Sequence, residues 1–287
     1  MLRIALPNKG RLSDDTRDLL RDAGLDVRAA GDRALVAAMG EEFEAIFVRA
    51  QDIPEFVADG AAHAGVTGLD LVAESGRDLE ELLDLRFGRC RIVVAAREES
   101  PIRSLSDFRG APRVATVFPR ISKRFFGDRQ CPVTLVPVSG ATEVTPHLGI
   151  ADIIVDLTST GSTLRVNGLR ELETVMESSA RLFASPAAMK SGEQRAAIGD
   201  LAMALESVLS ARGRRYLMAN VPRAALNAVR GVLPGLNGPT VVDILDADDL
   251  VAVHAVVDTS TVYRTINALR ALGAHGILVT RIERLTP

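Results

Sequence analysis

Short apolar runs alternate with helix-like stretches along most of this chain, and this alternation limits its fold more than any other feature. Residues 2–6 have the pattern of a strand, residues 8–11 that of a turn, and residues 13–23 that of an amphipathic helix ending at Gly24. A strand followed by a polar segment and a helix returns at 45–60. This order predicts an α/β fold with largely parallel sheets, in which ligands bind at the carboxyl ends of strands.

Composition narrows the class of protein. The chain has 287 residues, of which 47% are hydrophobic and 25% charged, enough for a substantial core divided among two or three domains. A net charge of -3 with no Trp gives little attraction or stacking surface for nucleic acid. Cys90 and Cys131 lack metal-ligand spacing, which indicates incidental thiols in a reducing compartment. No apolar run reaches the roughly 18 residues of a membrane span and no signal peptide is recognisable, so we expect a cytoplasmic protein.

The segment 152–164 carries the strongest functional signal. An apolar run leads to Asp156 and then to a turn rich in hydroxyl groups. Because the backbone N–H groups of a turn entering a helix converge on one point, such a turn can bind a phosphate, with Gly161 permitting a left-handed backbone and Asp156 suiting ribose hydroxyls. The alternative is an ordinary helix N-cap, where Ser and Thr are also favoured. The hydroxyl groups belong to Thr158, Ser159, Thr160, Ser162 and Thr163.

The remaining segments predict two lobes and a separate tail. A strand at 91–96 would cross into a second lobe and a strand at 171–177 would return, so that the lobes enclose a cleft. A helix at 192–212, with apolar residues at helical spacing, would complete the first lobe. The tail has the β-α-β-β-α-β order of a ferredoxin-like unit, which either binds a small ligand or only pairs with another copy. Its strands are expected at 215–219, 240–245, 250–257 and 276–282, and its helices at 222–232 and 260–272.

Segments spread over the whole chain share the motifs of one enzyme family. They are Leu6–Leu12, Arg49–Pro54, Gly65–Val72, Ala115–Pro119 with Phe125 and Phe126, Leu148–Asp152, Asn167–Leu169 and Leu272–Ala274. In these segments the sequence resembles the long form of the ATP phosphoribosyltransferases, the first enzymes of histidine biosynthesis. The resemblance implies an α/β protein with a two-lobed, periplasmic-binding-protein-like (type II) catalytic core and a C-terminal ferredoxin-like regulatory domain. The implied divisions are lobe I at 1–92 (completed by 174–212), lobe II with the phosphoribosyl pyrophosphate loop at 93–173, and the histidine-binding domain at 213–287.

The implied reaction joins N1 of the adenine of ATP to phosphoribosyl pyrophosphate and releases pyrophosphate. Positive charge develops on the sugar and negative charge on the leaving group, so the site should supply cations and rigid positioning. Mg²⁺ is the implied cofactor, held mainly by substrate oxygens, with Asp156 as the candidate carboxylate. Many phosphoribosyltransferases have paired acids before their phosphate loop, whereas here Asp152 lies at the opposite end of the strand. The resemblance further implies inhibition by histidine and a homo-oligomer in which dimers form hexamers.

The resemblance also assigns roles to individual residues. Arg49 leads the basic candidates because the guanidinium fork donates two hydrogen bonds to phosphate oxygens; its alternative is an ion pair with Asp52 or Asp70. Asp70 could instead only favour the helix dipole, and Glu143 could be a solvated loop carboxylate. The implied catalytic residues are Lys9, Arg33 and Arg49; the ATP contacts Lys9, Gly10, Arg11, Arg49 and Asp70; the phosphoribosyl pyrophosphate contacts Glu143, Asp156, Thr158, Ser159, Thr160, Gly161, Ser162 and Thr163; and the histidine contacts Asn220, Thr240 and Gly276.

Two functions from other classes fit parts of the sequence. A two-lobed small-molecule binding or sensor protein without catalysis would share the cleft, but it usually carries an export signal or a DNA-binding helix pair. An amino-acid sensor could use the tail, but it would leave the phosphate-type turn without a role.

Overall fold

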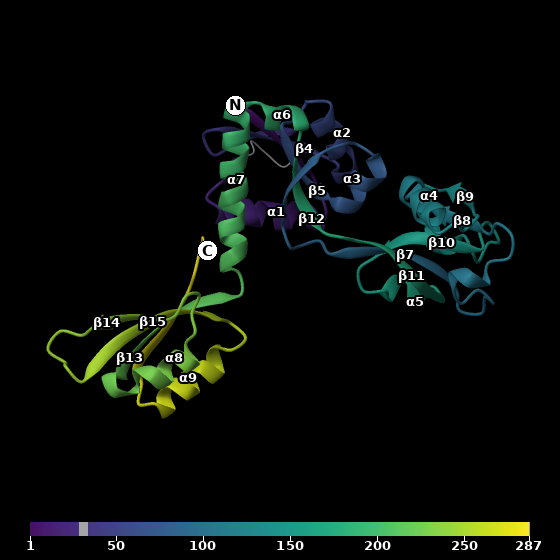
Figure 1. Ribbon diagram of the computed structural model, residues 1–287. Coiled ribbons are helices and arrows are strands. Elements are labelled where there is room, and N and C mark those ends of the chain that lie inside the picture. Colours follow the sequence, from purple (N-terminus) through teal and green to yellow (C-terminus); the bar gives the residue numbers. More distant parts are fainter. Residues whose placement is uncertain (29–33, 287) are drawn as a thin grey trace. The chain divides into compact units, whose positions relative to one another are not determined.

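The computed structural model describes residues 1–28 and 34–286, and within them a mixed sheet of seven strands forms the first lobe (Figure 1). Its order is β2-β3-β4-β1-β5-β12-β6, with β1 parallel to both β4 and β5. Ile4, Ala5 and Leu6 of β1 are all buried, as expected of a central parallel strand. The strands are β1 (Leu2–Pro7), β2 (Val27–Arg28), β3 (Val36–Met39), β4 (Phe43–Val48), β5 (Ala64–Gly68), β6 (Glu80–Asp84) and β12 (Ala180–Ala184); the helices are α1 (Arg11–Asp22), η1 (Ala50–Asp52), α2 (Ile53–Ala58), α3 (Leu69–Ser75) and α6 (Pro186–Lys190). Helix α7 (Gly192–Ala211) follows, and the division between the first unit and the C-terminal unit falls within it.

A second mixed sheet, in the order β11-β7-β10-β8-β9, forms the second lobe. Alternate residues of its central strands face two apolar layers: Val155 packs with Phe126 of α4, while Ile154 packs with Leu164 of α5. The two helices therefore cover opposite faces of the sheet (Figure 1). The elements are β7 (Cys90–Arg97), η2 (Leu105–Asp107), β8 (Arg113–Thr116), α4 (Pro119–Asp128), β9 (Thr134–Pro137), η3 (Thr142–Val144), β10 (Ile153–Thr158), α5 (Ser162–Val166) and β11 (Leu169–Ser178).

Two short connections join the lobes. Residues 85–89 lead from β6 to β7, and Ser179 alone separates β11 from β12. The two-lobed α/β core is confirmed, but the expectation of largely parallel sheets is wrong. Strand β7 carries the chain into the second lobe and β11 carries it back, so these two strands run in opposite directions side by side. Strand β7 is also antiparallel to β10, and β12, which follows β11 into the first lobe, is antiparallel to β5.

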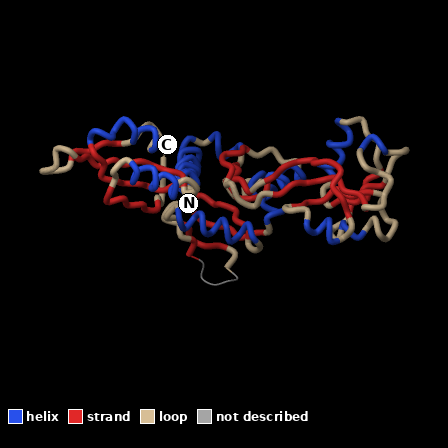
Figure 2. Tube along the Cα trace, turned by 90° about the horizontal axis from the view of Figure 1, so that it is seen from below, coloured by secondary structure: helices blue, strands red, loops and turns tan. Residues whose placement is uncertain are grey.

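The C-terminal part folds separately: the chain divides into Met1–Ala202 and Met203–Pro287. Its sheet has the order β14-β15-β13-β16 with antiparallel pairs throughout, which confirms the ferredoxin-like prediction. Every second residue of β15 is buried beneath α8 and α9, which lie side by side on one face of the sheet (Figures 1 and 2). The elements are β13 (Arg214–Pro222), η4 (Arg223–Ala225), α8 (Leu226–Val232), β14 (Thr240–Asp243), β15 (Leu250–Asp258), α9 (Val262–Ala271) and β16 (His275–Arg281). None of the helices described is long and apolar enough to cross a membrane.

Candidate active site

The hydroxyl-rich turn after β10 is closed by its own hydrogen bond. The buried hydroxyl of Thr158 accepts the backbone N–H of Gly161 at 2.9 Å. Gly161 has a φ of 74°, and a Cβ there would lie 2.8 Å from Oε1 of Glu171. The backbone angle therefore favours glycine, whereas the crowding comes from the flexible side-chain ends of Glu171 and Arg165, which could shift. Gly161 itself is the N-cap of α5 and makes no side-chain cap bond, so the ordinary Ser/Thr N-cap is not the arrangement adopted.

The other hydroxyl groups of the turn face outward. Ser159, Thr160, Ser162 and Thr163 are exposed, and the hydroxyls of Thr160 and Ser162 lie 2.9 Å apart. With only five residues, α5 has a small dipole. An anion here would therefore depend on the individual hydroxyl and backbone N–H donors of the turn.

Asp156 and Glu143 lie close together although they are distant in sequence. Asp156 is half-buried on β10, and Glu143 stands in η3. Burial raises the pKa of the Asp156 carboxyl and repulsion from Glu143 raises it further, whereas hydrogen bonds from the Leu157 N–H and the Thr142 hydroxyl oppose the shift. Glu143 is thus half-buried and lies near a second carboxylate.

A pocket of about 310 Å³ lies between the lobes. Leu12 and Asp70 line it from the first lobe, and Phe118, Leu157 and Ser159 line it from the second. A second pocket, of about 340 Å³, shares Arg89, Cys90 and Ser159 with the first. The hydroxyl-rich turn therefore opens onto the interlobe cleft through Ser159.

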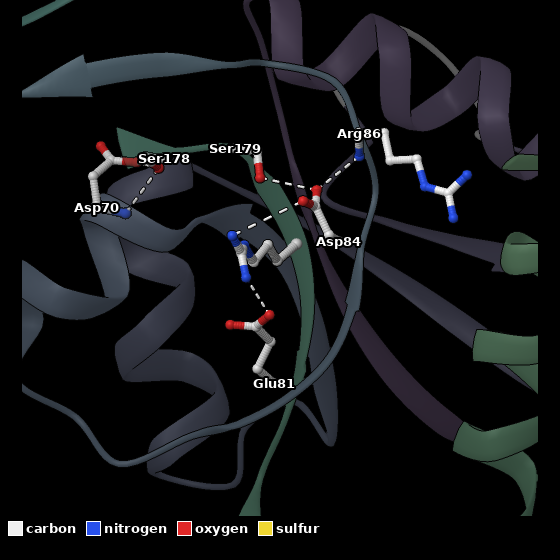
Figure 3. Close-up of polar contacts among 7 residues, drawn as sticks. Asp70, Glu81, Asp84, Arg86, Ser178 and Ser179 are labelled. Atoms are coloured by element: carbon white, nitrogen blue, oxygen red, sulfur yellow. Dashed lines mark hydrogen bonds and ion pairs between the residues drawn. The ribbon is translucent and has the colours of Figure 1, made fainter. Parts of the chain in front are cut away.

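Hydrogen bonds near the two connections between the lobes hold Asp70 and Asp84 in place beside the cleft (Figure 3). The Ser178 hydroxyl donates to Oδ1 of Asp70 at 2.5 Å and accepts the Asp70 N–H at 3.0 Å. The Ser179 hydroxyl donates to Asp84 at 2.9 Å, and so does the Arg86 N–H. Burial alone would raise the pKa of Asp84, but these two bonds and nearby arginines lower it below its ordinary value. Asp70 lies in the first turn of α3 and also lines the cleft. Its position therefore fits both a favourable interaction with the helix dipole and a contact to ATP.

The basic candidates of the first lobe lie at adjacent strand ends. Lys9 follows β1 and Arg49 follows β4, and the Asn8 N–H donates to the Val48 carbonyl at 2.8 Å. Both side chains are exposed, and Arg49 forms an ion pair with no carboxylate in the described ranges, so the pairing with Asp52 or Asp70 is absent. Gly10, with a φ of 81°, precedes α1, which begins at Arg11. Arg33 lies outside the described residues.

In the tail, the structure unites two of the three predicted histidine contacts. Asn220 and Gly276 lie on adjacent strands, where a Cβ on Gly276 would lie 3.3 Å from Nδ2 of Asn220. Thr240 pairs with His254 on the far side of β15. In the strand order β14-β15-β13-β16, one strand separates Thr240 from Asn220 and two separate it from Gly276.

Sequence reasoning missed Arg89 and Ser178, which line the cleft. Both lie at or next to the segments that connect the lobes. From sequence alone, these segments could be recognised only as the ends of strands. The useful signal was topological, because a two-lobed fold places the ends of its connections at the cleft.

Known proteins show the same combination of parts. The family model described as ATP phosphoribosyltransferase (HisG) matches residues 49–207, and the HisG C-terminal domain model matches residues 211–284. A Gemmatimonas aurantiaca protein named ATP phosphoribosyltransferase is 69% identical over 100% of both chains, and one from Natronomonas pharaonis is 50% identical over 100% of both. The solved ATP phosphoribosyl transferase (HisG:HisZ) complex from Thermotoga maritima has a TM-score of 0.64 and 26% identity, covering 73% of this chain and 99% of that chain. The chain therefore belongs to the ATP phosphoribosyltransferase family, in its long form, which catalyses the first step of histidine biosynthesis.

Proposed function

We propose that the interlobe cleft binds phosphoribosyl pyrophosphate on the second lobe and ATP against the first. The observation that supports this most directly is the exposed hydroxyl-rich turn, which reaches the cleft through Ser159. In the reaction, N1 of adenine forms a bond to the anomeric carbon as the bond from that carbon to the diphosphate breaks. The diphosphate takes the electron pair of the broken bond, so cationic donors around it lower the barrier.

The residues of the second lobe hold the sugar phosphate. The 5-phosphate accepts hydrogen bonds from the hydroxyls and backbone N–H groups of the turn, while Asp156 and Glu143 accept the ribose hydroxyls. Thr158 and Gly161 contribute by keeping the turn closed. The turn residues in this assignment are Thr158, Ser159, Thr160, Gly161, Ser162 and Thr163.

The first lobe supplies the charges for the polyphosphate groups. Lys9 and Arg49 lie on neighbouring exposed loops, and Arg49 can turn toward a ligand without breaking an ion pair to any described residue. Gly10 allows close approach of a phosphate to the backbone, because it has no side chain. Arg11 and Arg33 join this group by resemblance, and Asp70 is the candidate for a polar contact to ATP.

Mg²⁺ fits the pair of carboxylates in the second lobe. Burial is the main cause of the raised pKa of Asp156 and the charge of Glu143 adds to it, so a divalent cation would compensate the negative charge of this pair. When bound, the ion would neutralise diphosphate oxygens and keep most of its ligands from substrate and water. Asp156 and Glu143 are thus the residues that would hold it.

The tail is proposed to bind histidine and to regulate the catalytic core in a cytoplasmic homo-oligomer of dimers and hexamers. Asn220 and Gly276 are adjacent and could contact one small ligand together. Thr240 could join them only through a ligand that extends past β15. Coupling would require histidine to prefer one state of the assembly over another.

An assay with both substrates tests the catalytic proposal. The purified chain is mixed with ATP, phosphoribosyl pyrophosphate and Mg²⁺, pyrophosphate is removed enzymatically, and the ultraviolet change of an N1-substituted adenine is followed. Product that requires all three components supports the assignment. Binding of either substrate without product would instead favour a small-molecule sensor, and added histidine tests the tail in the same assay.

A further inference from the structure

Arg89 stands where the two pockets of the cleft meet. It lines both the pocket of about 310 Å³ and the pocket of about 340 Å³, together with Cys90 and Ser159. Its side chain is exposed, and no carboxylate of the described ranges lies within ion-pair distance of it. This cation and Ser159 of the hydroxyl-rich turn therefore line the same two pockets.

The neighbouring arginines of the second pocket are already engaged. Arg91 donates to both oxygens of Glu171, at 2.9 and 3.1 Å. Arg181 pairs with Glu81 and lies 3.9 Å from Asp84. Among the described arginines that line this pocket, Arg89 is therefore the one that can bind an anion without giving up an ion pair.

The position of Ser159 indicates which part of a bound ligand would lie near Arg89. Ser159 belongs to the turn proposed to hold the 5-phosphate, and it also lines the second pocket. A sugar anchored by its 5-phosphate at this turn extends its anomeric end away from it, and the adjoining pocket offers room for a polyanion. That pocket is also lined by the carboxylates of Asp84 and Glu177, and the hydroxyls of Ser178 and Ser179 already donate to Asp70 and Asp84. An anion there therefore depends on the arginines of the pocket.

We propose that Arg89 binds the diphosphate leaving group of phosphoribosyl pyrophosphate from the connection between the lobes. This inference rests on the proposed function of the hydroxyl-rich turn. The guanidinium fork can donate to two oxygens of the diphosphate, and it does so most strongly as the C–O bond breaks and charge collects there. Because residues 85–89 join the lobes, Arg89 reaches the ligand from the back of the cleft rather than from the loops that carry Lys9 and Arg49.

The test separates the two phosphate subsites by using two probes on the full chain. Calorimetry measures binding of Mg²⁺-pyrophosphate and, separately, of ribose 5-phosphate to wild type, Arg89→Gln and Arg89→Lys. Arg97→Gln is the matched control, because Arg97 lies at the other end of β7 and pairs with Glu99. We expect Arg89→Gln to weaken pyrophosphate binding at least tenfold and to leave ribose 5-phosphate unchanged, with partial recovery in Arg89→Lys and no change in Arg97→Gln.

Turnover gives a second readout. Arg89→Gln should lower kcat about 100-fold, the scale of one donor to developing charge, with an unchanged melting temperature. Unchanged pyrophosphate affinity, equal loss of both probes, or no pyrophosphate binding by wild type would each overturn the role of Arg89. Failure of ribose 5-phosphate to bind wild type would instead count against the turn, so the two failures are distinguishable.

Discussion

The carboxylate of Glu74 in the first lobe accepts the backbone N–H of Ile121 at 2.9 Å, at the start of a helix in the second lobe. Its other oxygen accepts the Arg120 N–H, also at 2.9 Å. Helix α4 has no side-chain cap of its own at Phe118, so a residue of the opposite lobe satisfies its first donors. The contact therefore joins the lobes beside the cleft.

Glu74→Ala should lower the free energy of unfolding by about 1 kcal/mol, the usual cost of losing a helix cap. Thermal or urea unfolding of the full chain measures the change. Glu206→Ala provides the control, because Glu206 is exposed on α7. If both variants unfold like wild type, the cap does not contribute to stability in solution.

The two aspartates at the ends of β10 should respond to pH in opposite ways. The pKa of Asp152 is lowered, chiefly by the hydrogen bond from the Arg113 side chain, whereas burial and Glu143 raise the pKa of Asp156. A lowered pKa stabilises the folded state above the unfolded pKa of about 4, and this contribution is lost as the pH falls. A raised pKa does the reverse, because the folded state then loses stability as the carboxyl ionises.

We therefore expect Asp152→Asn to lower the melting temperature at pH 7 and Asp156→Asn to raise it. Both differences should shrink toward pH 3, where the unfolded aspartates are protonated. Asp156→Asn should also reduce kcat/KM for phosphoribosyl pyrophosphate about ten- to 100-fold, because a hydrogen bond to a charged group contributes about 1.5–3 kcal/mol. Melting curves from pH 3 to 8 check the signs; changes of the same sign in both variants would refute the assignment.

Local features of the site were predictable from sequence, and long-range ones were not. The turn around Gly161 follows directly from an apolar strand that ends in Ser and Thr, because turn chemistry depends on neighbouring residues. The bond between Asp70 and Ser178 joins residues 108 positions apart. No local pattern indicates such a contact, since it depends on how the second crossing returns to the first lobe.

Sheet direction was missed for a related reason. Alternating strands and helices indicated parallel pairs, and β1 does pair in parallel with β4 and β5. The direction of β12 is set instead by the return of the chain from the second lobe, and β12 lies antiparallel to β5. Periodicity reports which face of a strand is buried but not which neighbour it pairs with.

Cys90 should react slowly with alkylating reagents despite lining the cleft. Burial, reinforced by the negative charge of Asp70, raises the pKa of its thiol to about 11. The thiolate, which is the reactive form, then makes up only about one part in a thousand at pH 8. In a Cys131→Ser chain, iodoacetamide labelling should rise about tenfold per pH unit from pH 8 to 10, and Asp70→Asn should accelerate it. A rate that levels off below pH 9 would contradict this environment.

Arg49→Ala should lower turnover by about 100-fold, the loss expected when one preorganised donor to developing charge is removed. Its guanidinium is exposed and holds no carboxylate in the described ranges, so the substitution should leave the melting temperature nearly unchanged. Arg77→Ala is the matched control, because Arg77 is an equally long side chain of the first lobe that pairs with Glu55 and Asp59. Steady-state rates with both substrates measure the effect. Equal rates in the two variants would remove Arg49 from the site, whereas a selective loss would assign its charge to the polyphosphate groups, because no structural ion pair is broken.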